Sequence, residues 1–261
     1  MIPAFVRYAI VIAAAGIGFL SAPAGVFGQE QECPVPDRFY TFEPPLPKTA
    51  RALAAGREVV IAALGGASPV GLAAGGPDLA WPARLAAALA ERFPSTRTKV
   101  VNLAVARQTA KTAAERLPRE VVHLKPTLVI WETGTMEAVR GTDVDEFRET
   151  VQAGIDELRA ARVDVVLMNM QFSRDTDTMI RFEPYLVVLR ELADANDVPL
   201  FRRYEIMRYW AEGGWLDLRA REGEKRRQLA AKLYDCLGRT MADFVTHGLP
   251  APKAASPGGD R

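Results

Sequence analysis

Short apolar runs alternate with amphipathic segments from residue 58 to residue 245. The runs are rich in Val, Ile and Leu without polar alternation, which is typical of strands buried on both faces of a parallel sheet. We expect five strands, at Glu58–Leu64, Lys99–Ala104, Thr127–Trp131, Asp164–Met170 and Pro199–Arg203. Helical periodicity predicts helices at Asp78–Phe93, Thr109–Lys125, Thr142–Arg162, Arg181–Asn196 and Glu222–Val245. The alternation predicts an α/β fold, a three-layer α/β/α sandwich with a five-stranded parallel sheet.

Open parallel sheets bind ligands at the carboxyl ends of their strands. We therefore expect the functional residues to lie in the segments that follow the strands. The first of these segments reads GGASPVGLAAGG and contains Ser68, a candidate nucleophile. It has neither the G-x-G-x-x-G pattern nor the P-loop pattern that cradles phosphates. We therefore expect no nucleotide and no other cofactor.

The two ends of the chain differ from its centre. Residues 1–28 have a positive charge at Arg7, an apolar run from Tyr8 to Leu20 and then small residues, with cleavage expected after Ala24 or Gly28. This is the layout of a secretory signal peptide, and the run falls short of the roughly 20 residues that span a bilayer. We expect a periplasmic or secreted protein with no stable membrane span after cleavage. An N-terminal arm (29–54), a domain (55–247) and a disordered tail (248–261) would follow.

The chain contains two cysteines, Cys33 and Cys236. In an oxidising compartment they are expected to form a disulfide, although two buried free thiols are the alternative. Two isolated cysteines and two distant histidines do not form a ligand cluster, so no metal site is expected.

A formal net charge of +1 gives no overall field that would attract nucleic acid. The densest basic stretch, Glu224–Arg227, is short and fits a solvated helix face. The balance therefore argues against a nucleic-acid partner.

Three segments that follow strands read LGGASPVG, NLAVARQTA and ETGTMEA. In this order and spacing, over about residues 55–245, they resemble the SGNH (GDSL-like) hydrolase superfamily of esterases and lipases. The pairs Trp81-Pro82 and Lys125-Pro126 agree with the superfamily's pattern. Among its members, the sequence most resembles exported alphaproteobacterial-type proteins. The resemblance implies a flavodoxin-like fold.

It also implies a mechanism. In that superfamily a serine attacks an ester carbonyl, and a histidine, oriented by an aspartate, takes the serine proton. A backbone N–H, a glycine N–H and an asparagine side chain stabilise the oxyanion.

The first block aligns without a gap, with Gly65 at the family's glycine and Gly66 after it, so Ala67 falls on the serine position and Ser68 lies one residue later. In the second block Asn102 matches, whereas Arg107 replaces the oxyanion glycine.

In the third block Gly134 and Thr135 match. Met136 replaces the asparagine donor, and Glu137 stands for an aspartate.

Two registers remain open for the final Asp-x-x-His block. One keeps an aspartate at Asp217, and the other, which is favoured by the Tyr234-x-Cys236 pattern, places Lys225 and Gln228 at the aspartate and histidine positions. Neither register contains a histidine. The chain's two histidines, His123 and His247, lie outside these blocks.

With these roles replaced, the sequence predicts a non-catalytic binding protein, a pseudoenzyme of the superfamily. Its ligand would be a cell-envelope carbohydrate, a glycolipid or a partner protein, contacted by Arg107 and Lys225 if both point inward. Hydrogen bonds would come from Asn102, Gln108, Thr109 and Glu137. The alternative is an atypical serine ester hydrolase in which Ser68 is activated by Glu137, Asp217 or Lys225.

Overall fold

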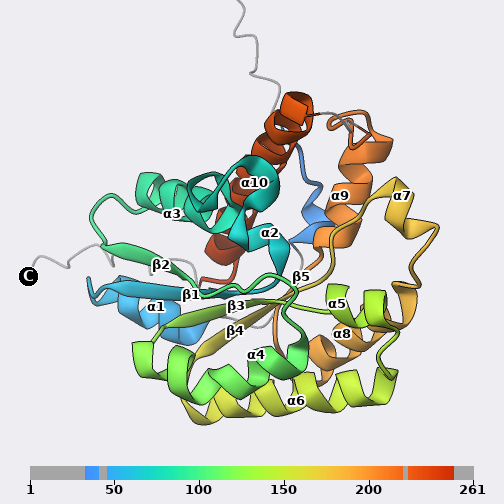
Figure 1. Ribbon diagram of the computed structural model, residues 1–261. Coiled ribbons are helices and arrows are strands. Elements are labelled where there is room, and N and C mark those ends of the chain that lie inside the picture. Colours follow the sequence, from blue (N-terminus) through green and yellow to red (C-terminus); the bar gives the residue numbers. More distant parts are fainter. Residues whose placement is uncertain (1–32, 41–45, 220–222, 250–261) are drawn as a thin grey trace, which may run out of the picture. The chain divides into compact units, whose positions relative to one another are not determined.

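Five parallel strands form one sheet in the order β2-β1-β3-β4-β5 (Figure 1). The strands are β1 (Val59–Leu64), β2 (Thr98–Asn102), β3 (Leu128–Glu132), β4 (Asp164–Met168) and β5 (Leu200–Phe201). β1 pairs with β2 and β3, β3 pairs with β4, and β4 pairs with β5, all in parallel. The last residues of the strands therefore lie along one edge of the sheet, here called the carboxyl edge.

The computed structural model describes residues 33–40, 46–219 and 223–249, all of which belong to one compact unit. The expected signal peptide and nearly all of the expected tail lie outside the described residues.

Helices cover both faces of the sheet, with α3 and α10 on one face and α4, α6 and α8 on the other (Figure 1). The helices are α1 (Pro47–Ala54), α2 (Ala67–Val70), α3 (Trp81–Arg92), α4 (Ala110–Arg116), α5 (Thr135–Arg140), α6 (Val144–Ala160), α7 (Arg174–Asp177), α8 (Glu183–Ala195), α9 (Arg203–Glu212) and α10 (Gly223–His247). The predicted α/β fold with a five-stranded parallel sheet is confirmed.

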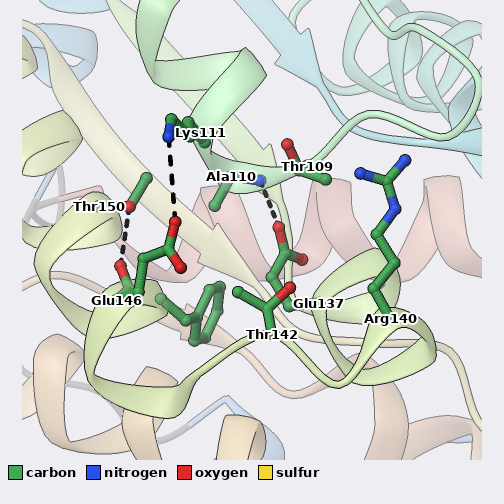
Figure 2. A pocket seen from close by; sticks show the side chains of 9 residues that line it. Thr109, Ala110, Lys111, Glu137, Arg140, Thr142, Glu146 and Thr150 are labelled. Carbon is green, nitrogen blue, oxygen red and sulfur yellow. Dashed lines mark hydrogen bonds and ion pairs between the residues drawn. The ribbon is translucent and has the colours of Figure 1, made fainter.

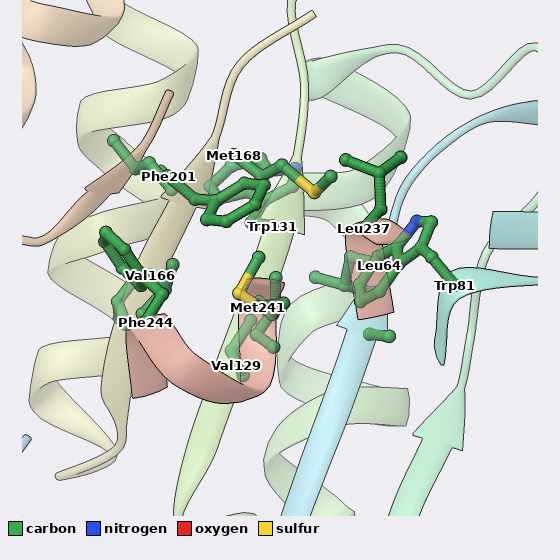
Figure 3. Packing of buried hydrophobic residues seen from close by; sticks show 14 of the residues in the cluster. Leu64, Trp81, Val129, Trp131, Val166, Met168, Phe201, Leu237, Met241 and Phe244 are labelled. Atoms are coloured by element: carbon green, nitrogen blue, oxygen red, sulfur yellow. The ribbon is translucent and has the colours of Figure 1, made fainter. Parts of the chain in front are cut away.

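The core forms where strand side chains meet the flanking helices (Figure 3). α10 contributes Leu237, Met241 and Phe244, and the ring of Phe244 packs edge-on against Phe201 of β5, with 5.3 Å between centroids. All five residues of β3 and of β4 are buried, which explains why these strands read as nearly continuous apolar runs.

The helix predicted at 109–125 is interrupted. α4 ends at Arg116 and continues as a π-helical turn at Leu117–Val121 and a 3-10 turn at Val122–Leu124. Pro118 explains the change, because proline has no N–H to donate and its ring clashes with the preceding turn of an α-helix.

Five helices were not predicted by the periodicity, namely α1, α2, α5, α7 and α9. α1 lies within the segment expected as an arm, and the Asp164 carboxylate at the start of β4 accepts the N–H groups of Lys48 and Thr49 in its first turn. The fifth strand, expected to reach Arg203, ends at Phe201, and Arg203 instead begins α9.

Candidate functional site

The carboxyl edge begins with a tight turn between β1 and α2. Gly65 has a φ of +158°, and a Cβ there would lie 2.9 Å from both the Cβ of Glu132 and the Cγ of Pro69. Only glycine therefore lets the turn approach the end of β3 this closely. The close approach brings Ser68 and Glu132 into the same region.

The neighbours Ala67 and Ser68 differ sharply in exposure. Ala67 is exposed, whereas Ser68 retains only 5% of its accessible surface. Ala67, which the sequence pattern predicts to stand at the serine position, therefore presents its methyl group to solvent. The hydroxyl one residue later is directed into the protein.

The Ser68 hydroxyl is held by a cation. It accepts a hydrogen bond from Nη2 of Arg203 at 2.9 Å and lies near the hydroxyl of Tyr234. Nη2 of Arg203 also donates to Oε1 of Gln171, at 3.1 Å. No carboxylate or imidazole is among the hydrogen-bond partners of Ser68 in the described part of the chain.

Arg203 forms a buried ion pair with Glu132. The Arg203 side chain is fully buried, and its Nη1 lies 3.0 Å from Oε2 of Glu132. Oε2 also accepts from the indole N–H of Trp81, at 3.3 Å. Burial raises the pKa of Glu132, opposed by the Arg203 guanidinium and the Trp81 indole. We call Ser68, Glu132, Arg203, Gln171 and Tyr234 the buried polar cluster.

Glu132 and Arg203 were not expected to belong to one site. The sequence around each residue is unusual. Glu132 ends the otherwise apolar strand sequence LVIWE, and Arg203 comes shortly after the apolar strand β5. A charge at the end of a strand buried on both faces needs a partner. The identity of that partner emerges only from the fold.

The segment after β2 is fixed by backbone contacts. Nδ2 of Asn102 donates to the carbonyl of Pro69 at 2.6 Å, and its Oδ1 accepts from the N–H of Ala104. Arg107 is exposed and has a φ of +62°, a left-handed conformation that glycine adopts readily. With its amide turned so that nitrogen faces Gly65, Gln108 donates to the Gly65 carbonyl at 3.0 Å and accepts from Arg116.

Glu137 is a buried link between two helices. Its Oε2 accepts from the N–H of Gly134 at 3.2 Å, and its Oε1 accepts from the N–H of Ala110 at 2.5 Å. The predicted binding residue therefore joins the starts of α5 and α4. Thr135 and Met136, which precede it, are both half-buried.

A polar pocket of about 220 Å³ opens beside Glu137 (Figure 2). The side chain of Glu137 lies between those of Lys111 and Arg140, and Thr109 lines the same pocket (Figure 2). Lys111 Nζ lies 4.0 Å from a carboxylate oxygen of Glu146, whereas Arg140 has no ion-pair partner among the described residues. Thr109 and Glu137 are the two predicted binding residues that the structure brings together here.

The residues proposed for the final catalytic block lie on the surface. Lys225 and Gln228 are exposed in the first turns of α10, where Nε2 of Gln228 donates to Glu224 at 3.3 Å. Asp217 is exposed and lies 3.8 Å from the Nε of Arg219. None of the three is hydrogen-bonded to Ser68.

Both histidines lie away from the carboxyl edge. His123 is in the turn that precedes β3, and His247 is the last residue of α10, stacked on Tyr40 with 4.9 Å between ring centroids. The carbonyl of Gly248, the next residue, accepts a hydrogen bond from the N–H of Leu46, which directly precedes α1. The first turn of α1 is in turn hydrogen-bonded to Asp164, the first residue of β4. The end of α10 is therefore at the opposite edge of the sheet.

The predicted disulfide between Cys33 and Cys236 is present, with 5.7 Å between the two Cα atoms. The described residues contain no cluster of three or more His, Cys, Asp or Glu side chains suited to a metal ion. Within the same residues, none of the helices has the length and hydropathy needed to cross a bilayer.

Comparison with known proteins decides the family, because the sequence model of the Non-GDSL lipase-like family matches residues 32–251. The chain belongs to the Non-GDSL lipase-like family. The resemblance of this family member to the SGNH superfamily is also confirmed at the level of the fold.

Thioesterase 1/protease 1/lysophospholipase L1 of Escherichia coli K12 is 26% identical over 121 residues, which are 46% of this chain and 55% of that protein. The chain thus spans about half the length of the curated relatives that it matches.

Two solved structures share the fold. The lipase/acylhydrolase from Enterococcus faecalis has a TM-score of 0.51 at 20% identity, covering 68% of this chain and 93% of that one. A two-domain esterase active on acetylated mannans, co-crystallised with mannopentaose, has a TM-score of 0.58 at 16% identity, covering 80% of this chain and 55% of that one.

Proposed function

We propose that this family member is an exported binding protein that lacks serine-esterase activity. The observation that carries the proposal is the environment of Ser68, whose buried hydroxyl accepts a hydrogen bond from the Arg203 guanidinium. A nucleophilic serine needs a neighbouring base that can take its proton. Arginine stays protonated in proteins and cannot do so.

The other catalytic roles are also unfilled in this proposal. Ala67, Met136 and Gln228 stand in for the nucleophile, the oxyanion amide and the general base. Arg107 and Lys225 replace the oxyanion glycine and the aspartate, and both are exposed. Members of a catalytic triad act as a unit, so the loss of several leaves little of the mechanism.

The proposed ligand is a carbohydrate of the cell envelope, either free or as part of a glycolipid. The polar pocket beside Glu137 supports this class, because Thr109, Lys111 and Arg140 offer hydroxyl and cationic donors around a carboxylate. The fold is also shared with an esterase that was crystallised with mannopentaose. The remaining carboxyl-edge groups, Gly65, Gly66, Asn102, Gln108, Gly134 and Thr135, would shape the neighbouring surface.

Export to the periplasm or the cell exterior is part of the proposal. The sequence pattern of residues 1–28 and the Cys33–Cys236 disulfide both support it.

A fluorophosphonate probe tests the absence of esterase chemistry, because it labels activated serines. We expect the wild-type protein and Ser68→Ala to show equal, background labelling, and an active serine esterase run in parallel to label fully. Labelling of the wild type that disappears in Ser68→Ala would establish the alternative, a hydrolase that uses Ser68.

Titration with acetylated mannan oligosaccharides tests the ligand class. We expect Arg140→Ala to weaken binding by about tenfold, since a hydrogen bond from a charged group contributes about 1.5–3 kcal/mol. Arg148→Ala is the matched control, because Arg148 pairs with Glu191 on the α6–α8 surface. Equal affinities for both variants and the wild type would exclude this pocket as the carbohydrate site.

A further inference from the structure

A second pocket, of about 180 Å³, lies beside the buried polar cluster. It is formed by the first turns of α10, the middle of α9 and the loop that follows α9, the segment after β4, and Ala73 in the segment after α2. Its wall is mainly apolar and includes Phe172, Met207, Leu218, Leu229, Ala230 and Leu233. Phe172, Met207 and Leu233 are each at most 8% exposed, so they form the deeper part of this open pocket. We call it the apolar pocket.

The polar groups of the apolar pocket are few. Gln171 and Tyr234 belong to both the pocket and the buried polar cluster, where they contact Arg203 and Ser68 respectively. Because Tyr234 is only 4% exposed, this end of the pocket is the inner one.

Among the residues that the structure describes, Arg226 is the only charged residue in the lining of this pocket, and it is exposed at the rim. It has no ion-pair partner among the described residues, whereas the adjacent Arg227 pairs with Glu224. The pocket therefore combines an apolar interior with one unpaired positive charge at its entrance.

The volume limits the size of an occupant. A protein cavity of about 150 Å³ lined by Leu, Ile and Phe holds benzene, the established example for an engineered cavity. A pocket of about 180 Å³ thus suits a hydrocarbon body of roughly six to eight carbons. The guanidinium at the rim would add a charge-assisted hydrogen bond to one carboxylate.

We propose that the apolar pocket binds a small amphipathic carboxylate, with its hydrocarbon body against the apolar wall and its carboxylate at Arg226. This inference goes beyond the proposed carbohydrate binding, because it concerns a different pocket and does not depend on whether Ser68 is reactive. It assigns the buried face of α10's first turns to ligand recognition.

Calorimetric titration of the full protein with octanoate tests the charge requirement. We expect octanoate to bind at least about fivefold more tightly than 1-octanol, which has the same chain length without the charge. Arg226→Ala should remove that preference by weakening octanoate alone. The matched control Arg227→Ala should retain it, because Arg227 is already paired with Glu224.

Filling the pocket tests the location. Ala230→Phe adds a ring within the apolar wall and should abolish octanoate binding, while titrations with mannan oligosaccharides stay as in the wild type. If Ala230→Phe does not fold, judged by circular dichroism, Arg226→Glu is used instead and should weaken octanoate more than Arg226→Ala does. Absence of octanoate binding, or equal binding by the wild type, Arg226→Ala and Ala230→Phe, would overturn the proposal.

Discussion

At the scale of single residues, Arg203 contacts three parts of the chain from a position that solvent does not reach. Its guanidinium lies against Ser68 after β1, Glu132 at the end of β3 and Gln171 after β4. A buried ion pair gains little net stability over apolar residues, because desolvation offsets the Coulomb attraction. Removing one partner is far more costly, since it leaves a charge without compensation.

A double-mutant cycle measures this coupling. We expect Arg203→Met and Glu132→Leu each to lower the free energy of unfolding by about 3–5 kcal/mol, because each leaves the other charge buried and unpaired. The double variant should lose much less than the sum of the two. Urea denaturation at constant pH gives the three values, and strictly additive losses would mean that the two charges do not interact.

Arg107 holds a backbone conformation that costs energy for any residue with a Cβ. Its φ of +62° is the left-handed region. We expect Arg107→Gly to raise the free energy of unfolding by about 0.5–1 kcal/mol, because the gain in the folded state exceeds the entropy that glycine adds to the unfolded chain. Arg107→Ala keeps the Cβ and should show no such gain in the same urea titration.

At the scale of elements, α1 depends on a carboxylate from β4. Its N-cap residue, Leu46, has no side chain that can accept a hydrogen bond, so Asp164 takes that role from another part of the chain. Oδ2 of Asp164 accepts from the N–H of Lys48 at 2.9 Å and from that of Thr49 at 2.8 Å. One side chain thereby attaches a helix to the start of a central strand.

Loss of this cap should destabilise the protein about as much as the loss of an ordinary N-cap side chain, which belongs to the helix that it caps. We expect Asp164→Ala to lower the free energy of unfolding by about 1–2 kcal/mol, because two N–H groups lose their acceptor. Asp164→Asn retains one acceptor oxygen and should lose less. Thermal unfolding followed by circular dichroism distinguishes the variants. Equal losses of stability in Asp164→Ala and Asp164→Asn would show that the hydrogen bonds accepted by the Asp164 carboxylate contribute nothing specific.

The pattern of apolar runs allowed the sheet to be predicted because each strand is buried on both faces. The same pattern could not locate α1 or α9, whose stability depends on Asp164 and on the packing of Trp210 rather than on a long periodic repeat. The turn that contains Ser68 indicated where to expect a candidate site, at the carboxyl edge. The pairing of Glu132 with Arg203 could not be predicted, because β3 and β5 are separated by β4 in the sheet.

At the scale of the whole molecule, the disulfide joins residues that are 203 positions apart. It attaches the segment before α1 to the middle of α10, next to the hydrogen bond from the Trp210 indole to the Pro34 carbonyl. Cys236 is 1% exposed, so this bond lies against the core. A cross-link over so long a loop stabilises mainly by restricting the unfolded chain.

Replacing both cysteines should lower stability without altering the fold. We expect Cys33→Ser/Cys236→Ser to lower the free energy of unfolding by about 2–4 kcal/mol. The expected drop in melting temperature should match that of the wild type measured with a reducing agent. A wild-type melting temperature that does not change on reduction would contradict this account.

The position of the disulfide also affects how the chain acquires it during synthesis. Cys236 is made long after Cys33, so the bond can close only when all five strands have already been synthesised. With two cysteines in the sequence, one intramolecular pairing is possible. Oxidative folding of this protein therefore needs an electron acceptor but no isomerase to correct mispaired bonds.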